Sequence, residues 1–440
     1  MSKILFVEPD LRTDKLGMLY LSAVLKAAGH EVDLVLGNHK ADAEARCGAW
    51  RPDFVMYSAA TGNHRWYFET NAYLKRWHDF KAICGGSHLT FFPDDGLGDP
   101  DIDYVVRGPA EDLIVDLVEH PERHDKLITG TVPDIESLPA PDRSILYQYP
   151  QFGEARMKRF MACRDCPNAC TYCFNHLYHR IFKDQRGQFY QTTSPRKMVD
   201  EVLAVKKKWG LELAYFNDDN FARDHEWLTE FCRLFKDEVG IQFCGSVRAD
   251  SLTEDVVRMM AWAGCSFQNI ALESAVPSTQ KLLRRGKVSN DHIRQACEWF
   301  DKYGVKVRLQ NMVGLPVADP VEDALQTLEF NQSVPITDSW ASTLVPFKNT
   351  DIWQHCIDAG LIDEDTDAMT FYDSTPLKFD EVTRRRIDAI SKWWYYAVKW
   401  GMSRAAIMDL IDIPLADEQR ILIQQARWAE AARVLYGLEG

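Results

Sequence analysis

Four of the eleven cysteines fall within a single short stretch, residues 163–173. Cys166, Cys170 and Cys173 have the spacing C-x₃-C-x₂-C, and the aromatic Tyr172 stands before the last of them. Three thiolates can ligate three irons of a four-iron cluster and leave the fourth iron open to an exogenous ligand, which four-cysteine sites do not. The stretch therefore predicts a [4Fe-4S] cluster on which substrate chemistry can take place.

Two alternatives compete for these thiols. Zinc ribbons present two C-x₂-C knuckles separated by a dozen or more residues, and the sequence has no second knuckle. Cys163 forms a C-x₂-C pair with Cys166 and could supply a fourth thiolate, but we expect it on a strand, as a wall residue. The other cysteines lie mostly in apolar or helical contexts, where we expect free buried thiols: Cys47, Cys84, Cys232, Cys244, Cys265, Cys297 and Cys356.

The first part of the chain alternates strand-length apolar runs with helix-length amphipathic segments, which is typical of an α/β fold with a parallel sheet. The predicted strands are Ile4–Val7, Glu31–Leu36, Asp53–Ser58, Phe80–Cys84 and Tyr104–Val106. The predicted helices are Gly17–Ala28, Trp66–Trp77 and Ala110–Glu119. We interpret residues 1–135 as a doubly wound, Rossmann-like domain whose ligand site lies beyond the carboxyl ends of its strands.

A proline-rich stretch that shows neither helical nor strand periodicity predicts a linker over residues 136–157. A second alternating series over residues 158–350 suits a partial TIM-type barrel of six β/α units. Its predicted strands are Phe160–Cys163, Leu213–Asn217, Ile241–Gly245, Phe267–Leu272, Val305–Asn311 and Ala341–Val345. In residues 351–440 apolar side chains recur at helical spacing, which predicts a helical tail packed on the barrel.

The run from Phe160 to Asn175 resembles the cluster loop of the radical S-adenosylmethionine (SAM) superfamily. This resemblance implies that SAM chelates the open iron through its amino and carboxylate groups. An electron from the cluster then cleaves SAM and releases a 5′-deoxyadenosyl radical. It also implies an external electron donor such as flavodoxin or ferredoxin.

Downstream motifs follow in the order of that superfamily. Asp218 and Asp219 end the second strand and are candidates to receive the SAM amino group, and Arg248 ends the third. Glu273, in a Glu-Ser-Ala motif similar to the family's Glu-Ser-Gly, would face the SAM ribose. The resemblance implies the following SAM contacts: Tyr172, Asp218, Asp219, Arg248, Glu273, Arg285, Gly314 and Leu315.

The first domain resembles the cobalamin-binding domains fused to one branch of radical SAM enzymes. Small residues at strand ends would let the backbone approach a wide corrin. The implied cobalamin contacts are Leu16, Gly17, Ser58, Gly62, Gly86, His88, Thr90, Gly108 and Glu111. No histidine stands in an Asp-x-His-x-x-Gly motif, so we expect no imidazole below cobalt, and we expect His64 and His88 to be loop histidines. The alternative is an ordinary doubly wound domain whose glycines only make turns.

These features predict a cobalamin-dependent radical SAM methyltransferase that acts on an unactivated carbon, or on phosphorus, of a small-molecule substrate. The corrin would lie between the first domain and the barrel. The alternatives are radical rearrangement or oxidative cyclisation without methyl transfer, and a non-enzymatic iron–sulfur or cobalamin sensor. A net charge of −14 argues against nucleic-acid binding. We expect no membrane association and a cytoplasmic location, because the chain has no long apolar stretch.

Overall fold

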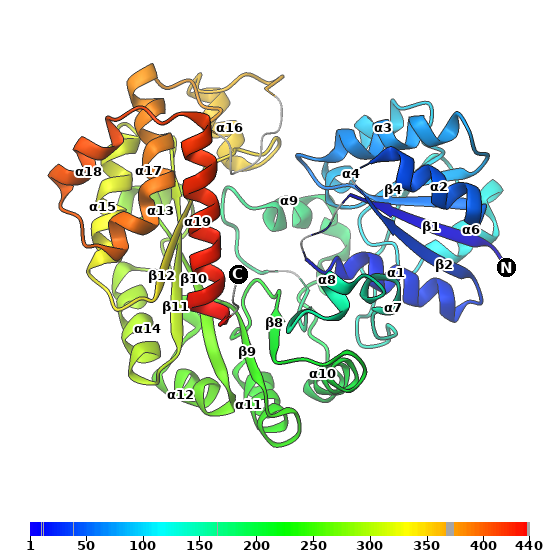
Figure 1. The fold of residues 1–440 in the computed structure, drawn as a ribbon, viewed down its shortest axis with the longest axis horizontal. Helices are drawn as coiled ribbons and strands as arrows, with labels where there is room; N and C mark the ends of the chain where they lie inside the picture. Colours follow the sequence, from blue (N-terminus) through cyan, green and yellow to red (C-terminus); the bar gives the residue numbers. More distant parts are fainter. Residues whose placement is uncertain (10, 12, 38, 165, 367–373, 438–440) are drawn as a thin grey trace. The chain divides into compact units, whose positions relative to one another are not determined.

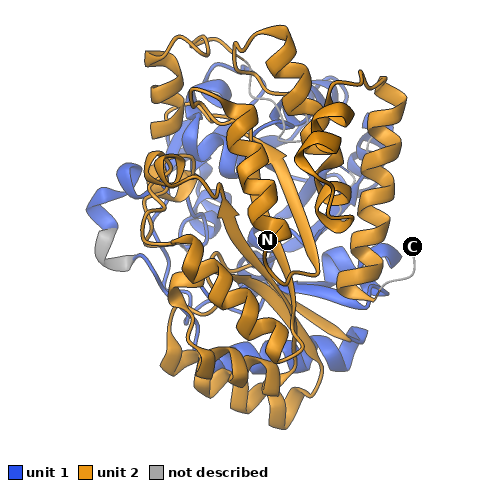
Figure 2. Cartoon of the chain, turned by 90° about the vertical axis from the view of Figure 1, so that its left-hand side faces the viewer, with its two compact units in different colours: residues 1–164, 178–211 blue, residues 165–177, 212–440 orange. Residues whose placement is uncertain are grey.

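The computed structural model describes residues 1–440 apart from 10, 12, 38, 165, 367–373 and 438–440 (Figure 1). It contains two compact units, coloured separately in Figure 2. Unit 1 consists of Met1–Arg164 and Tyr178–Leu211, and unit 2 of Asp165–Leu177 and Glu212–Gly440. The chain therefore changes unit three times, and the segment that carries the three predicted cluster cysteines belongs to unit 2.

Unit 1 is built on a parallel six-stranded sheet in the order β2-β1-β3-β4-β5-β6. The strands are β1 (Lys3–Glu8), β2 (Glu31–Leu36), β3 (Phe54–Ser58), β4 (Lys81–Gly85), β5 (Tyr104–Arg107) and β6 (Leu127–Thr129). The order reverses at β1, as doubly wound sheets require, and this confirms the predicted fold class. β6 was not among the predicted strands, because it has only three residues and no alternation.

The helices of unit 1 connect consecutive strands. They are α1 (Leu16–Ala27), α2 (Lys40–Trp50), α3 (His64–Lys75), α4 (Ser87–Phe91), α5 (Pro93–Leu97), α6 (Ile114–Glu119), α7 (Ser144–Tyr147), α8 (Pro150–Gly153) and α10 (Pro195–Trp209), with the 3₁₀ turns η1 (Pro121–Arg123) and η2 (Lys183–Gln188). β7 (Met157–Phe160) also lies in this unit, and α9 (Phe174–Ile181) contains the second change of unit. Leu5, Val7, Val55 and Cys84 belong to the core, and each is at most 1% exposed.

The stretch predicted as a linker contains α7 and α8 and contacts the sheet domain directly. The Asp142 backbone N–H donates to the Leu19 carbonyl at 2.9 Å, and the Tyr149 hydroxyl donates to the Leu34 carbonyl at 2.9 Å. The guanidinium of Arg143 is buried between two carboxylates, 3.4 Å from Asp14 and 2.7 Å from Glu201. These contacts fix residues 136–157 against the rest of unit 1.

Unit 2 contains a parallel sheet in which β8 to β12 follow one another in sequence order. These strands are β8 (Leu213–Phe216), β9 (Gln242–Val247), β10 (Cys265–Glu273), β11 (Lys306–Val313) and β12 (Asp338–Thr343). Each lies where the sequence predicts a barrel strand. The first predicted barrel strand corresponds to β7, which ends at Phe160; Cys163 keeps only an isolated antiparallel bridge to Thr192.

The helices of unit 2 alternate with these strands and continue into the tail. They are α11 (His225–Leu234), α12 (Glu254–Ala263), α13 (Pro277–Leu282), α14 (Asn290–Lys302), α15 (Pro320–Gln332), α16 (Asp351–Asp358), α17 (Glu381–Lys399), α18 (Arg404–Ile411) and α19 (Asp417–Tyr436), with the short segments η3 (Phe235–Val239) and η4 (Ala249–Ser251). No helix in the described part of the chain is long and apolar enough to cross a membrane.

The helical tail is part of the core of unit 2, as the sequence predicts. α17 buries Ile387, Ile390 and Trp394, which share one apolar cluster with Leu328 of α15. The Trp394 indole N–H donates to the Ser339 hydroxyl of β12 at 2.7 Å. This indole therefore packs against the sheet.

Candidate functional site

The cysteine loop is anchored to unit 2 by the residue that precedes Tyr172. Thr171 donates through its backbone N–H to the Leu283 carbonyl at 3.3 Å and through its hydroxyl to the Leu282 carbonyl at 3.2 Å. Its own carbonyl accepts from the Ile352 N–H at 3.0 Å. The end of α13 and the start of α16 thus hold the middle of the loop between Cys170 and Cys173.

The three cysteines of the loop suit a cluster better than a single metal ion. Cys170 is buried, whereas Cys166 and Cys173 are half-buried. Three thiolates on one tetrahedral zinc would lie about 3.8 Å apart, given Zn–S bonds of about 2.3 Å. In the described chain these three sulfur atoms do not all lie within 4.8 Å of one another. Their number and wider spacing fit the three-thiolate site of a four-iron cluster.

Burial favours the protonated thiol at Cys166 and Cys173 while no metal neutralises the charge. Burial raises the pKa of Cys173 to about 12, with smaller contributions from Asp219 and the other two cysteines. Burial also raises the pKa of Cys166, although the Asn168 amide donates to its sulfur at 3.2 Å and opposes the shift. A bound metal deprotonates coordinating thiols outright, so cluster assembly releases protons from this loop.

Glu273, at the end of β10, points into a buried polar site that also contains Tyr172 and Arg285. Its backbone φ is +67°, a left-handed value that non-glycine residues rarely adopt, and the register of β10 against β11 shifts between Ala271 and Glu273. The Tyr172 hydroxyl donates to the Glu273 carboxylate at 2.8 Å, and the Arg285 guanidinium lies 3.4 Å from the same hydroxyl. Such backbone strain persists where the surrounding structure holds it, and it is concentrated at functional sites.

Burial dominates the electrostatics of this group. It raises the pKa of Glu273, and the nearby Arg285 partly offsets the rise. The Nε of Arg285 is buried with no hydrogen-bond partner, while another of its nitrogens donates to the Ala271 carbonyl. A buried carboxylate and a partly unsatisfied guanidinium both require polar partners, which the hydroxyls and carboxylate of SAM would provide. The site therefore fits the cofactor that the sequence predicts.

A second buried carboxylate supports the turn that follows Glu273. Asp323 of α15 accepts from the Ser274 hydroxyl at 3.0 Å and from the Thr279 hydroxyl at 2.5 Å. Thr327, one turn later on α15, accepts from the Ala275 backbone N–H at 3.0 Å. Sequence reasoning missed Asp323, because it looks like an ordinary acidic residue in the first turn of a helix.

The remaining predicted SAM residues lie at the carboxyl ends of β8, β9 and β11. Asp218 is buried, and Asp219 accepts from the Asn175 amide at 2.8 Å, which ties it to the cysteine loop. Arg248 pairs with the neighbouring Asp250 through two contacts of 3.0 and 2.9 Å. The last two predicted SAM residues, Gly314 and Leu315, lie directly after β11, and Gly314 has φ +71°.

The predicted cobalamin residues gather at the carboxyl edge of the sheet in unit 1. An apolar cavity of about 150 Å³ lies at the ends of β1, β3, β4 and β5. Five predicted residues line it: Gly17, Ser58, Gly86, Gly108 and Glu111. A Cβ at Gly86 would lie 2.5 Å from the Ala59 carbonyl, so only glycine lets the two loops approach this closely. The cavity fits a ligand that enters between closely packed backbone segments.

The other four predicted cobalamin residues do not line this cavity, although one supports its wall. The Thr90 hydroxyl donates to the Gly86 carbonyl at 2.9 Å and accepts from the Gly108 N–H at 3.1 Å. Leu16 is buried at the start of α1, and Gly62 has φ +98° in the loop before α3. His88 lies in α4 and contacts other polar side chains of unit 1.

A buried ion pair at the end of β1 was not predicted. Glu8 is fully buried, and it accepts from Lys15 at 2.6 Å and from the Tyr67 hydroxyl at 2.5 Å. Burial raises the pKa of Glu8, and Lys15 is the main opposing influence. A lysine just before a helix carries no sequence signal for such a contact, which depends on α3 supplying Tyr67.

Comparisons with known proteins match two separate parts of the chain to known domains. Residues 2–118 match the B12 binding domain, and residues 162–330 match the radical SAM superfamily. The chain is 26% identical over 316 residues to an anaerobic magnesium-protoporphyrin IX monomethyl ester cyclase of Synechocystis sp., a match that covers 64% of this chain and 61% of that one. It is 21% identical over 339 residues to a cytidylyl-2-hydroxyethylphosphonate methyltransferase of Streptomyces wedmorensis, covering 64% of this chain and 62% of that one.

The fold is also similar to that of a solved radical SAM methyltransferase. The radical SAM methyltransferase TsrM from Kitasatospora setae, solved with tryptophan and a SAM analogue, superposes with a TM-score of 0.68 at 14% identity and covers 95% of this chain and 92% of that one. The chain spans about three fifths of the length of the cyclase and phosphonate methyltransferase relatives.

The chain thus combines a B12-binding domain with a radical SAM domain, which confirms the combination predicted from the motifs. The same two domains confirm the predicted cofactors: a [4Fe-4S] cluster, SAM and cobalamin. The roles of the individual residues toward these cofactors stay predictions.

Proposed function

We propose that this chain is a cobalamin-dependent radical SAM methyltransferase that methylates an unactivated carbon, or phosphorus, of a small molecule. One observation carries the proposal: the cysteine loop is joined to a strained, buried carboxylate by the Tyr172–Glu273 hydrogen bond. The cavity at the sheet edge of unit 1 supports the cobalamin part of it. A phosphonate methyltransferase and a radical SAM methyltransferase among the similar proteins favour methyl transfer.

When bound, the cluster and SAM supply a 5′-deoxyadenosyl radical, and cobalamin supplies a methyl carrier. The protein's own residues bind and orient these groups. Cys166, Cys170 and Cys173 would hold the cluster, and Glu273 would accept hydrogen bonds from the SAM ribose. Gly17 and Gly86 leave room at the cavity for part of the cobalamin, which is larger than the cavity itself. Burial of the polar groups around Glu273 excludes water from the site.

Reduction of the cluster requires a partner protein. We propose a flavodoxin or ferredoxin as the external electron donor, because nothing else in the proposed chemistry supplies the electron. The small-molecule substrate would be read by side chains that the sequence motifs do not identify.

Methyl transfer can be distinguished from its two alternatives in one experiment. The reconstituted, cobalamin-loaded chain is incubated without oxygen with reductant, candidate small molecules and SAM that carries a deuterated methyl group. Transfer of the labelled methyl group to a product supports the proposal. An unlabelled product that has lost hydrogen would favour oxidative cyclisation, the activity named for the cyclase relative. Absence of any SAM cleavage would favour a sensor.

A further inference from the structure

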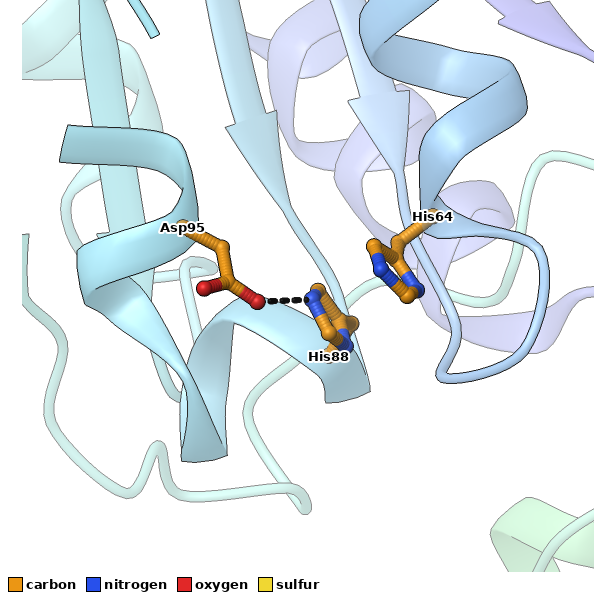
Figure 3. A group of neighbouring side chains, drawn as sticks. All are labelled: His64, His88 and Asp95. Atoms are coloured by element: carbon orange, nitrogen blue, oxygen red, sulfur yellow. Dashed lines mark hydrogen bonds and ion pairs between the residues drawn. The ribbon is translucent and has the colours of Figure 1, made fainter. Parts of the chain in front are cut away.

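Two histidines and an aspartate from three successive helices of unit 1 lie close together, with His88 between Asp95 and His64 (Figure 3). His64 is the first residue of α3, His88 lies in α4 and Asp95 in α5. One potential ligand atom from each lies within 4.8 Å of the other two. Among the described residues, no other set of three His, Cys, Asp or Glu side chains meets that distance. His88 is one of the predicted cobalamin contacts, but none of the three residues lines the cobalamin cavity.

The distance between His88 and Asp95 matches that between two ligands of one metal ion. His88 Nε2 lies 2.9 Å from the Asp95 carboxylate, the contact drawn in Figure 3. Two ligands about 2.0–2.1 Å from one zinc ion lie about 2.9–3.4 Å apart at angles between 90° and 110°. The His88 and Asp95 atoms therefore already have the required separation. The His64 and His88 rings are stacked, with centroids 3.8 Å apart and planes 10° apart, so the His64 ring has to turn out of this stack before its nitrogen can point at the same ion.

The state of His88 also suits a ligand. Its Nε2 donates to the Asp95 carboxylate, and its Nδ1 lies 3.2 Å from the Thr61 hydroxyl. When an ion replaces the Nε2 proton, Nδ1 can carry the proton and donate to Thr61. Metal-bound histidines usually have such an outer hydrogen bond on the second nitrogen.

We propose that His64, His88 and Asp95 form a binding site for one divalent transition-metal ion. Zinc is the ion to test, because both imidazole and carboxylate groups bind it. Three protein ligands leave a further coordination position for water. The Asp95 carboxylate is half-exposed, so an ion can enter the site from the solvent beside it.

The ion would act on the fold by joining three segments that follow β3 and β4. α4 and α5 have only five residues each, and helices of that length are not stable without tertiary contacts. α4 also contains Thr90, which holds the Gly86 and Gly108 backbone at the cavity wall. A metal at His88 would therefore stabilise the wall of the cobalamin cavity, which makes the site structural.

Zinc titration of the full-length chain tests the proposal. The cluster is reconstituted first, so that iron occupies the cysteine thiolates, and Zn²⁺ binding is then measured by anaerobic calorimetry while the iron content is monitored. We expect one saturable equivalent of Zn²⁺ with unchanged iron. His64→Ala and Asp95→Asn should lower the Zn²⁺ affinity by about 100-fold or more. Thr61→Val should lower it by about 10-fold, as loss of an outer hydrogen bond typically does. Of these variants, Asp95→Asn should disturb folding least, because this side chain is half-exposed.

A matched control is available in the same unit. His124 Nε2 lies 2.8 Å from the Asp116 carboxylate, a similar pair that belongs to no three-ligand group among the described residues. His124→Ala should leave Zn²⁺ binding unchanged. Zn²⁺ should raise the melting temperature of the wild-type chain but not that of Asp95→Asn. Equal Zn²⁺ affinity in folded Asp95→Asn and wild type would overturn the proposal. Nitrogen hyperfine structure in the cob(II)alamin spectrum that disappears in His64→Ala would also overturn it, because His64 would then be a cobalt ligand.

Discussion

The Tyr172 hydroxyl lies 2.8 Å from the Glu273 carboxylate, and this hydrogen bond joins the cysteine loop to the end of β10 across 101 positions of the sequence. The strand end and the loop are thus held in one arrangement before any cofactor is bound. Glu273 is the carboxylate that we expect to bind the SAM ribose. The Tyr172 bond fixes where that carboxylate points.

Tyr172→Phe removes this bond while it keeps the ring that packs beside Leu283 and Met312. We expect SAM affinity to fall by about 10-fold, because a hydrogen bond to a charged group contributes about 1.5–3 kcal/mol and part of it is replaced on binding. The iron content should not change. Equilibrium dialysis of SAM against the reconstituted variant measures the effect; unchanged SAM affinity would show that the bond does not position Glu273.

Glu273 can be replaced in two ways that separate its side chain from its backbone. Glu273→Gly and Glu273→Ala should both weaken SAM binding by about 1.5–3 kcal/mol, because both remove the carboxylate. Only Ala retains the left-handed strain at φ +67°, so it should be less stable than Gly by about 1 kcal/mol. SAM binding and urea unfolding of both variants provide the comparison. Equal stability would contradict the strained backbone.

The cysteine assignment is tested by a pair of alanine variants. Cys166→Ala should lose most of the iron and all SAM cleavage, whereas Cys163→Ala should keep both. Cys163 lies in an extended segment bridged to Thr192, and its sulfur contacts the Arg164 carbonyl at 3.6 Å. Iron analysis and a SAM-cleavage assay are the measurements, and the reverse pattern would refute the assignment.

Two glycines at the cavity of unit 1 should respond differently to alanine. Gly17 lies in α1, and a Cβ there has no atom within 4 Å, so Gly17→Ala should fold and gain about 1 kcal/mol from helix propensity while it weakens cobalamin binding. Gly86→Ala would place a Cβ 2.5 Å from the Ala59 carbonyl at φ +93°, and it should destabilise unit 1. Thermal unfolding and cobalamin retention separate the two effects. Full cobalamin affinity in Gly17→Ala would exclude this cavity as the site.

Arg143 carries the strongest stability prediction. Its guanidinium is buried against Asp14 and Glu201, and it also donates to the Tyr147 hydroxyl at 2.7 Å. Arg143→Met should destabilise unit 1 by about 3–5 kcal/mol, because it leaves two carboxylates buried without their cation. Denaturant unfolding checks this, with the exposed Arg258→Met as a control of little effect. A loss below about 1 kcal/mol would contradict the buried pairing.

The parts of the fold that local patterns determine could be predicted from the sequence. Apolar runs predicted the strands from β1 to β12 except the three-residue β6 and β7, which lies three residues before its predicted position. The cysteine spacing predicted the cluster loop. Glu273 was found from its motif, but its left-handed backbone was not, because the register shift depends on β11.

Contacts between distant segments could not be predicted in the same way. Asp323 supports Ser274 from 49 positions away, and Lys15 reaches Tyr67 across 52. Both are ordinary charged residues in their local sequence. The proximity of His64, His88 and Asp95 was missed for the same reason: each follows a different turn, and only the parallel sheet brings those turns to one edge.

The three changes of unit along the chain have a consequence for how such a protein can be taken apart. A fragment that begins at Glu212 would contain β8 to β12 but none of the three predicted cluster cysteines, since residues 165–177 precede it. A fragment that ends at Leu211 would carry the cysteines without Glu273 and Arg285. No single cut yields two self-sufficient modules, so recombination during evolution would have to exchange both units together or rebuild the cysteine segment in a new host.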